Sequence, residues 1–307
     1  MNGQKANERR KGPEFGVRVS VDGETLTNLR FADDCILLAQ SRSDAQKMLR
    51  RFMEISAEYG LQVHPSKTKL ISWTQWSHGC QHLQIGTSSF AILSEYESER
   101  YLGRKFCLHK CQATELHHRI SAAWAKFQSF KQELTGKNCS VKSRLRLFEA
   151  VVSSTVLHGS CTWALTRHMA ETLDIARRKM LRHVLRIFRR RTGETNLEEW
   201  SEYMKRSARV IEDHDAWYNL VAWSLQARAR KWKFAGALVR SNDQRWSKLV
   251  LDWVLAQGKR NVGRPLTRWV DDIDKYAGGE WKLLAASQED WDAHCSGFVS
   301  DVFSRTT

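Results

Sequence analysis

Two adjacent aspartates, Asp33 and Asp34, lie between two apolar segments of strand length. Thr25–Phe31 alternates apolar and polar residues, and Cys35–Ala39 is a short apolar run. Both patterns are typical of β-strands, so we expect the aspartates at a tight turn between two strands. Adjacent carboxylates repel each other, and exposing both at one turn favours the binding of a hard divalent cation. A polar hairpin turn without function is the alternative for an isolated Asp-Asp pair.

A second hairpin is expected before the acidic turn and a helix after it. Residues 17–21 alternate polar and apolar side chains, and Asp22-Gly23 can form the turn. Ser41 or Ser43 can cap a helix whose apolar residues recur at i, i+3, i+4 and i+7. Short strands are then expected at residues 61–63 and 69–73. Amphipathic patterns beyond residue 110 predict helices at residues 115–134, 142–157, 169–188, 197–239 and 245–255.

The chain carries a large excess of positive charge. Of its 307 residues, 49 are Lys or Arg and 34 are Asp or Glu, which leaves a net charge of +15. Because 42% of the residues are hydrophobic, the chain can still bury a core, and wholesale disorder is not expected. The charge indicates a polyanionic partner, for which nucleic acid is the commonest candidate.

The sequence shows no sign of a membrane or secretory segment. No apolar run approaches the roughly 18 residues that a membrane span requires, and residues 1–12 lack an apolar signal-peptide region. The seven cysteines are an odd number at scattered spacings, which is typical of reduced thiols. We therefore expect an intracellular protein, nuclear or cytoplasmic, that is neither membrane-bound nor secreted.

The segment Arg177–Arg191 concentrates the positive charge. It contains eight cations in fifteen residues and no acid. On a helix, Arg178, Arg182, Arg186 and Arg189 would form one stripe that could follow a phosphate backbone. A solvated helix face is the alternative, although uncompensated cations repel one another and favour an anionic partner.

A second basic segment interleaves cations with aromatic residues. In residues 228–234, Arg230, Lys231 and Lys233 surround Trp232. Such a pattern suits neutralisation of phosphates combined with stacking on bases. The equally weighted alternative is a helix that buries Trp232 while its cations remain solvated.

Three motifs in order resemble the palm of a reverse transcriptase, specifically the non-LTR (LINE-type) retrotransposon group. The aromatic-x-Asp-Asp box is LRFADDCILLA over Leu29–Ala39, and a helix separates it from Gly60–Lys69, which reads GLQVHPSKTK. Tyr101-Leu102-Gly103 matches the hairpin that follows. Segments further along also resemble the tail of such reading frames, namely His118-Arg119-Ile120, Leu157-His158-Gly159 with Trp163, Met180-Leu181-Arg182 and Gly263-Arg264-Pro265 with Arg268-Trp269.

The resemblance implies roles for individual residues. Asp33 would coordinate the metal, with Asp34 as its weaker neighbour, and Phe31 would pack near the primer end. Lys67 would offset charge on the leaving pyrophosphate or supply a proton, and Tyr101, Leu102 and Gly103 would form the primer grip. The cofactor would be Mg²⁺ or Mn²⁺ in the full-length polymerase, and the partners an RNA template and a DNA primer. His64 stands where the family usually has Asn, which should affect the local turn more than the chemistry.

The resemblance also implies the fold. We expect an α+β protein with a disordered basic N-terminus at residues 1–14 and a partial palm of antiparallel strands plus a helix at 15–108. A helical thumb-like region would occupy residues 109–195, and a helical, Trp-rich C-terminal region residues 196–307.

The family's second essential aspartate lies well upstream of the acidic turn. Only 32 residues precede Asp33 here, and residues 1–21 contain no aspartate. We therefore expect a polymerase fragment that is inactive alone, since a two-metal site needs ligands from more than one strand. The alternative is a remnant that binds nucleic acid through its basic helices without chemistry. Cys107, Cys111 and nearby histidines do not complete a four-ligand pattern, so zinc is not expected.

Overall fold

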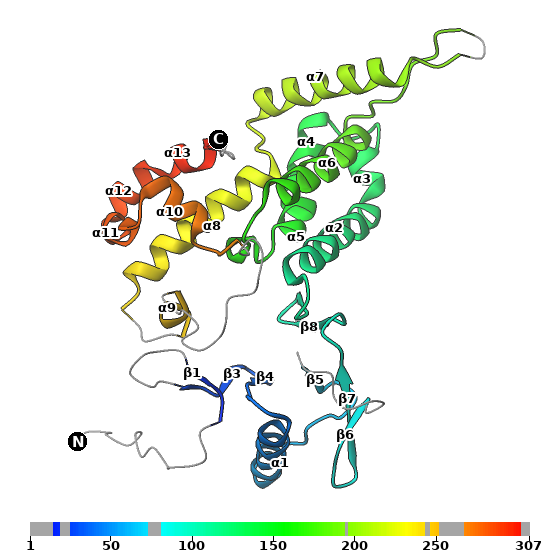
Figure 1. Ribbon diagram of the computed structural model, residues 1–307. Helices are drawn as coiled ribbons and strands as arrows, with labels where there is room; N and C mark the ends of the chain where they lie inside the picture. Colours follow the sequence, from blue (N-terminus) through cyan, green and yellow to red (C-terminus); the bar gives the residue numbers. More distant parts are fainter. Residues whose placement is uncertain are drawn as a thin grey trace. The chain divides into compact units, whose positions relative to one another are not determined.

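The computed structural model describes residues 15–18, 25–72, 81–193, 196–242, 246–251 and 267–301. These form two compact units, one of residues 15–102 with 246–251 and one of residues 103–242 with 267–301. Most strands belong to the first unit, and the second is almost entirely helical, so the chain is an α+β protein (Figure 1). The segment expected to be disordered, 1–14, lies outside the described residues.

Two antiparallel hairpins begin the first unit. β1 (Val17–Arg18) pairs with β2 (Thr25–Leu26), which confirms the first predicted hairpin, while its turn lies outside the described residues. β3 (Asn28–Phe31) pairs with β4 (Asp34–Leu37), so the acidic pair lies between two strands as expected.

α1 (Arg42–Glu58) follows, and its ends explain one wrong prediction. Ser41 caps the helix, since its hydroxyl oxygen accepts a hydrogen bond from the Asp44 amide. At the other end, the amides of Gly60 and Leu61 donate to the carbonyl oxygens of Ala57 and Ser56, a Schellman closure in which Gly60 has φ +72°. Because the Leu61 amide hydrogen-bonds to the end of α1, residues 61–63 form no strand.

A three-stranded sheet completes the first unit. β5 (Lys69–Ile71) pairs in parallel with β7 (Ser88–Leu93), and β7 pairs antiparallel with β6 (His82–Ile85). β5 confirms a strand within the expected range 69–73, although it ends at Ile71, and residue 73 lies outside the described residues. The β6–β7 hairpin was not predicted. Its buried side chains pack against α1 in a small core of Leu49, Leu83, Ile85 and Phe90.

The first unit ends in a hairpin whose turn contains the unit boundary. β8 (Glu99–Tyr101) pairs with β9 (Arg104–Phe106). The two turn residues, Leu102 and Gly103, have φ +47° and +77°. Positive φ at both positions is typical of the tight turns that match the twist of paired strands. α9 (Trp246–Leu251) also belongs to the first unit.

The second unit is a helical assembly around one large apolar core. α2, α6 and the segment between them contribute Phe127, Phe148 and Met180 to this core, and α8 adds Trp223, which stacks on Phe148. Its helices are α2 (Cys111–Ser129), α3 (Lys131–Thr135), α4 (Val141–Leu147), a π-helix (Phe148–Ser153), α5 (Ser154–Val156), a 3₁₀ turn (Ser160–Thr162), α6 (Arg167–Val184), α7 (Trp200–Tyr218), α8 (Trp223–Arg240), α10 (Asp271–Ala277), α11 (Trp281–Ala286), α12 (Gln288–Ala293) and α13 (Cys295–Ser300).

Three of the predicted helices are divided in the structure. The helix expected at 115–134 is α2 and α3, which are separated at Phe130. The helix expected at 142–157 consists of α4, the π-helix and α5. The helix expected at 197–239 is α7 and α8, separated at Asn219, which adopts a left-handed φ of +51°. Asn tolerates that conformation better than other non-glycine residues, so this break has a local cause that helical periodicity does not reveal.

Candidate catalytic turn and nucleic-acid interface

The β3–β4 hairpin presents its acids at the tip. Phe31 pairs with Asp34, which leaves Ala32 and Asp33 as the two turn residues. Ala32 has a left-handed φ of +52°, a conformation that is costly for a side-chain-bearing residue. Both aspartates are exposed, and Phe31 is 64% exposed. The tip therefore offers two carboxylates and one aromatic ring to a ligand.

Tyr101 lies near this acidic tip. Its side chain is half-buried, and burial raises the pKa of the phenol, which the negative charges of Asp34 and Cys35 raise further. A charge affects a neighbouring pKa in this way only over a short distance. The structure thus brings together two motifs that are about 65 residues apart in the sequence, the Asp-Asp box and the Tyr-Leu-Gly hairpin.

Lys67 occupies an exposed turn after α1. The amides of Lys67 and Thr68 donate to the His64 carbonyl oxygen at 3.2 and 3.0 Å, and His64 Nδ1 lies 3.0 Å from the Ser66 hydroxyl. His64 thus organises this turn through its backbone and its ring. Within the described part of the chain, no ion pair joins Lys67 to Asp33 or Asp34. The predicted role of Lys67 therefore remains a prediction.

In the second unit, buried charges fix the Gly103 backbone. Glu115 is fully buried and accepts hydrogen bonds from Arg119 Nε at 2.7 Å and from the Lys105 amide at 2.6 Å. Arg119 in turn donates to the Gly103 carbonyl oxygen. Burying a carboxylate is costly unless it is paired in this way, so the cluster stabilises one conformation of residues 103–105.

The two carboxylates at the acidic tip are of the kind that a hard cation prefers. Carboxylate oxygens are the ligands that Mg²⁺ and Mn²⁺ prefer. Among the described residues, no group of three His, Cys, Asp or Glu side chains lies close enough to hold a metal ion. Cys107 is buried, and its thiol donates to the His109 carbonyl oxygen at 2.7 Å.

The predicted arginine stripe is interrupted in the structure. α6 ends at Val184, where the amides of Arg186 and Ile187 close a Schellman motif on the carbonyl oxygens of His183 and Arg182. Arg186 takes a left-handed φ of +57°, and Ile187 turns into the core. Arg178 and Arg182 therefore share a helix, whereas Arg186 and Arg189 lie beyond it, and the prediction of one continuous helical stripe was wrong.

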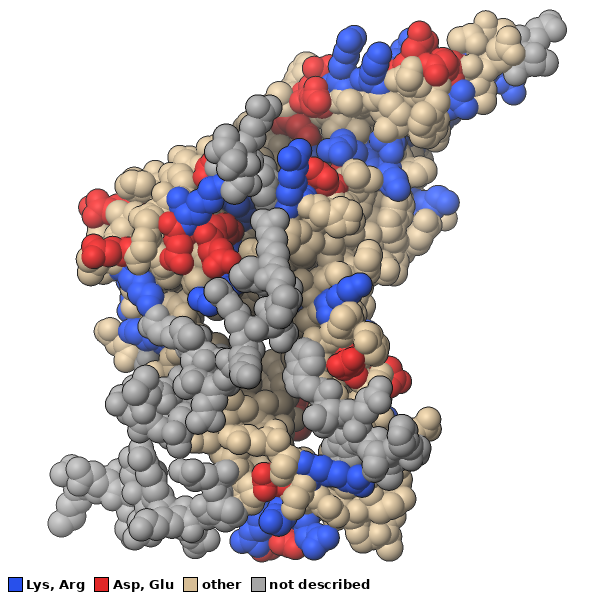
Figure 2. All heavy atoms as spheres, in the orientation of Figure 1, with Lys and Arg blue, Asp and Glu red and all other residues tan. Residues whose placement is uncertain are grey.

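Two members of the basic segment have partners in the fold. Arg177 is buried and makes a bidentate ion pair with Asp215 of α7, with N–O distances of 2.7 and 2.8 Å. Arg189 donates through Nε to the Glu198 carbonyl oxygen at 2.9 Å. By contrast, Arg178 and Lys179 are exposed and form no ion pair with a described acid. Figure 2 shows Lys and Arg side chains over α6 and α7 with a few acids between them.

The second basic segment is mostly interior. Trp232 is fully buried, and Lys231 is buried with its ammonium 2.6 Å from Asp272 of α10. In this conformation neither residue offers a surface to nucleic acid. The alternative of a buried Trp232 with solvated cations is confirmed for Trp232 and is wrong for Lys231. Arg230 and Lys233 are exposed, and Arg230 donates to the Leu157 carbonyl oxygen at 2.9 Å.

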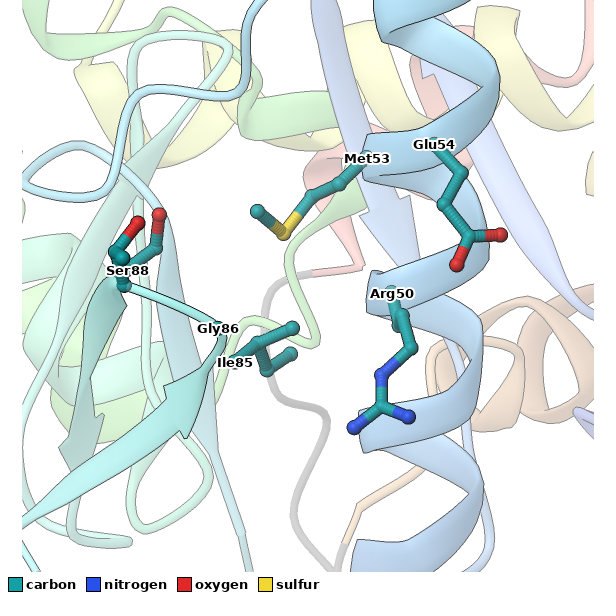
Figure 3. Close-up of a pocket in the computed structure, with 7 residues that line it drawn as sticks. Arg50, Met53, Glu54, Ile85, Gly86 and Ser88 are labelled. Carbon is teal, nitrogen blue, oxygen red and sulfur yellow. The ribbon is translucent and has the colours of Figure 1, made fainter.

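A separate cavity of about 450 Å³ lies between α1 and the β6–β7 turn. Figure 3 shows Arg50, Met53 and Glu54 on its helix side and Ile85, Gly86 and Ser88 opposite. None of the residues predicted to be catalytic lines it. Within the described residues, no helix has the length and apolarity to cross a membrane.

Comparison with known proteins finds a family whose match to this chain includes the acidic β3–β4 hairpin. Residues 14–106 match the family described as reverse transcriptase (RNA-dependent DNA polymerase), and this range contains the acidic turn, Lys67 and the Tyr101–Gly103 hairpin. A transposon-derived protein of Caenorhabditis elegans is 30% identical to this chain over 280 residues, a match that covers 88% of this chain and 95% of that protein. The similarity to this relative therefore extends through the helical unit, far beyond residues 14–106. The chain belongs to the reverse transcriptase family of retrotransposons.

Proposed function

We propose that Asp33 and Asp34 supply the acidic turn of an RNA-directed DNA polymerase, and that this chain alone does not complete the active site. The observation that carries the proposal is the β3–β4 tip, where two exposed carboxylates lie beside Phe31 and near Tyr101. The substrates would be an RNA template and a DNA primer with its incoming nucleotide.

Mg²⁺ bound by these carboxylates would stabilise negative charge on the reacting phosphates. Asp33, at the turn itself, would be the principal ligand, and Asp34 would assist it. The Tyr101 phenol is protonated at neutral pH, and its raised pKa keeps it protonated further into the alkaline range, so it adds no negative charge beside Asp34. Lys67 would bind the phosphates of the nucleotide, and the Leu102–Gly103 turn would position the primer.

Inactivity of the isolated chain follows from the incomplete donor set. Two carboxylates from one turn hold one cation weakly, and phosphoryl transfer with two metals needs a further carboxylate from a neighbouring strand. Primer extension with the purified chain, an RNA template, a DNA primer and Mg²⁺ or Mn²⁺ should yield no template-directed product. A product that Asp33→Asn abolishes would contradict the inactivity while supporting the role of Asp33.

Metal binding tests the acidic turn without requiring activity. Titration with Mn²⁺, followed by electron paramagnetic resonance, should show a weak site that Asp33→Asn/Asp34→Asn removes. Glu212→Gln/Asp213→Asn is the matched control, because it removes two adjacent exposed acids from α7. Equal loss in both variants, or no loss in either, would contradict the proposed ligands.

A second candidate function is nucleic-acid binding without chemistry. The exposed cations Arg178 and Lys179 on α6, together with Arg182, favour it. Replacing all three by Gln should reduce the slope of log affinity against log salt by about 2–3, since each phosphate contact contributes about 0.7–0.9. An unchanged slope would contradict this function for α6.

A further inference from the structure

The connection between α6 and α7 carries an unusual combination of exposed aromatic and basic residues. Phe188 is 61% exposed and Trp200 is 59% exposed. Four of the six residues in Arg186–Arg191 are arginines, and none of the six is acidic. Large aromatic side chains normally contribute to a core, so their exposure together with uncompensated cations indicates an interaction surface.

Glu198 holds this connection in one conformation. Its carboxylate accepts hydrogen bonds from Arg206 Nε at 2.9 Å and Arg206 Nη2 at 2.7 Å, and from the Arg190 amide at 3.2 Å. Its carbonyl oxygen accepts from Arg189 Nε at 2.9 Å, and its amide donates to the Arg190 carbonyl oxygen at 2.8 Å. A single acid therefore organises the arginines on both sides of the connection.

The same contacts orient the two rings. Arg206 donates to the Phe188 carbonyl oxygen at 2.8 Å, which fixes the backbone beneath the exposed phenyl ring. The centroids of the Trp200 and Tyr203 rings are 5.4 Å apart. The Arg189 guanidinium lies 5.9 Å from the centroid of the Trp200 ring. Tyr203 is itself anchored, since its hydroxyl donates to the Ile187 carbonyl oxygen at 3.2 Å. The two rings are thus exposed on a backbone that hydrogen bonds hold in place.

Arg190 and Arg191 supply the charge of this surface. Both side chains are exposed, and neither forms an ion pair with a described acid. The Glu198 carboxylate hydrogen-bonds to the Arg206 side chain and to the Arg190 amide, and it forms no ion pair with the side chain of Arg190 or Arg191. We call Phe188, Arg189, Arg190, Arg191 and Trp200 the aromatic–arginine surface.

We propose that the aromatic–arginine surface binds single-stranded nucleic acid. Phe188 and Trp200 would stack on unpaired bases while Arg190 and Arg191 contact the flanking phosphates. Exposed rings can stack only on bases whose faces are free, and a duplex keeps its base faces stacked. The proposal rests on the proposed function for nucleic acid as the ligand class, but it names a different part of the chain from the acidic turn.

Six forms of the full chain test the proposal. They are the wild type, Phe188→Ala/Trp200→Ala, Trp200→Phe, Trp217→Ala, Arg190→Gln/Arg191→Gln and Asp33→Asn. Trp217 is the matched control, because it lies on the same helix as Trp200, is 83% exposed and contacts no described arginine by its ring. Fluorescence anisotropy with labelled oligo(dT), oligo(rU) and a duplex measures affinity, and circular dichroism confirms that each form is folded.

The double alanine variant should lose roughly tenfold or more in affinity for each single strand, as expected from base–aromatic stacking. Its affinity for the duplex should change by less than about twofold, and Trp200→Phe and Trp217→Ala should bind the single strands nearly as the wild type does. Loss for only one of oligo(dT) and oligo(rU) would assign the surface to DNA or RNA respectively. Arg190→Gln/Arg191→Gln should reduce the single-strand salt slope by about 1.4.

Unchanged single-strand affinity in the double alanine variant, or an equal loss for duplex, would overturn the proposal. Competition by polyglutamate as strong as that by oligo(dT) would also overturn it, in favour of an acidic protein partner. Asp33→Asn separates the two proposals, since it should leave single-strand binding intact. A failed Mn²⁺ titration with normal oligo(dT) binding would contradict the acidic site alone.

Discussion

Trp232 and Trp291 stack face to face at the centre of the C-terminal helices, with ring centroids 3.6 Å apart and planes 3° from parallel. Each indole Nε1 donates to the other residue's main-chain carbonyl oxygen at 2.8 Å. Both side chains are fully buried. The pair satisfies its own polar atoms, so two large rings can be buried at no cost in unpaired donors.

Removal of one ring should therefore destabilise the second unit strongly. Trp291→Ala leaves a cavity and removes the ring that stacks on Trp232, while the main-chain acceptor of the Trp232 indole remains. The free energy of unfolding should fall by about 3–5 kcal/mol. Chemical denaturation followed by circular dichroism measures this change. Trp217→Ala, at an 83% exposed position, should change it by less than about 0.5 kcal/mol. Similar values for the two variants would contradict the buried stack.

Gly236 makes the approach of Trp291 possible. A Cβ atom at position 236 would lie 2.5 Å from Trp291 Cδ1 and Nε1, which is closer than atoms can approach. Because the Trp291 ring is buried and stacked, it cannot move aside. Gly236→Ala should lower the melting temperature through overpacking, at a cost of about 1–3 kcal/mol. Gly193→Ala, at a site with open space around it, is the control and should have little effect.

Arg177 and Asp215 should behave as a structural pair. Asp215→Ala leaves the buried Arg177 guanidinium without its counter-charge, which should cost about 3–5 kcal/mol of stability. Arg177→Met/Asp215→Ala should recover part of that loss, because no charge remains buried. Arg177→Met alone should leave the salt slope of nucleic-acid binding unchanged, and a reduced slope would indicate that Arg177 contacts phosphate.

The hydrogen bonds from Arg206, assisted by the Arg190 amide, lower the pKa of Glu198 to about 2 from its ordinary 4.5. A lowered folded-state pKa means that the carboxylate stabilises the fold above pH 4.5 and that this stabilisation is lost as the pH falls toward 2. The melting temperature should therefore decrease across that range more steeply in the wild type than in Glu198→Gln. Parallel curves for the two proteins would show that Glu198 does not organise the α6–α7 connection.

The local pattern around the acidic turn was sufficient to predict much of the first unit. Alternation in residues 25–31 and the apolar run after Asp34 encode two strands, and the Ser41 cap encodes the start of α1. These features depend on neighbours in sequence, so they can be recognised without tertiary structure. The β6–β7 hairpin has few such markers, and its strands are stabilised by packing Phe90 and Leu83 against Leu49 of α1. That contact spans more than thirty residues, and periodicity does not encode it.

The candidate functional residues also fall into two groups, those that the sequence alone identified and those whose exposure only the tertiary structure decided. Residue type and order alone determined that this chain carries the Asp-Asp box, Lys67 and the Tyr-Leu-Gly hairpin of a reverse transcriptase, because these motifs are contiguous. Which cations face solvent was decided by the tertiary structure. Arg177 and Lys231 are buried against acids 38 and 41 residues away, whereas Phe188 and Trp200 are exposed beside arginines. Charge and hydrophobicity belong to single residues, but burial depends on distant parts of the chain and is settled only when they pack.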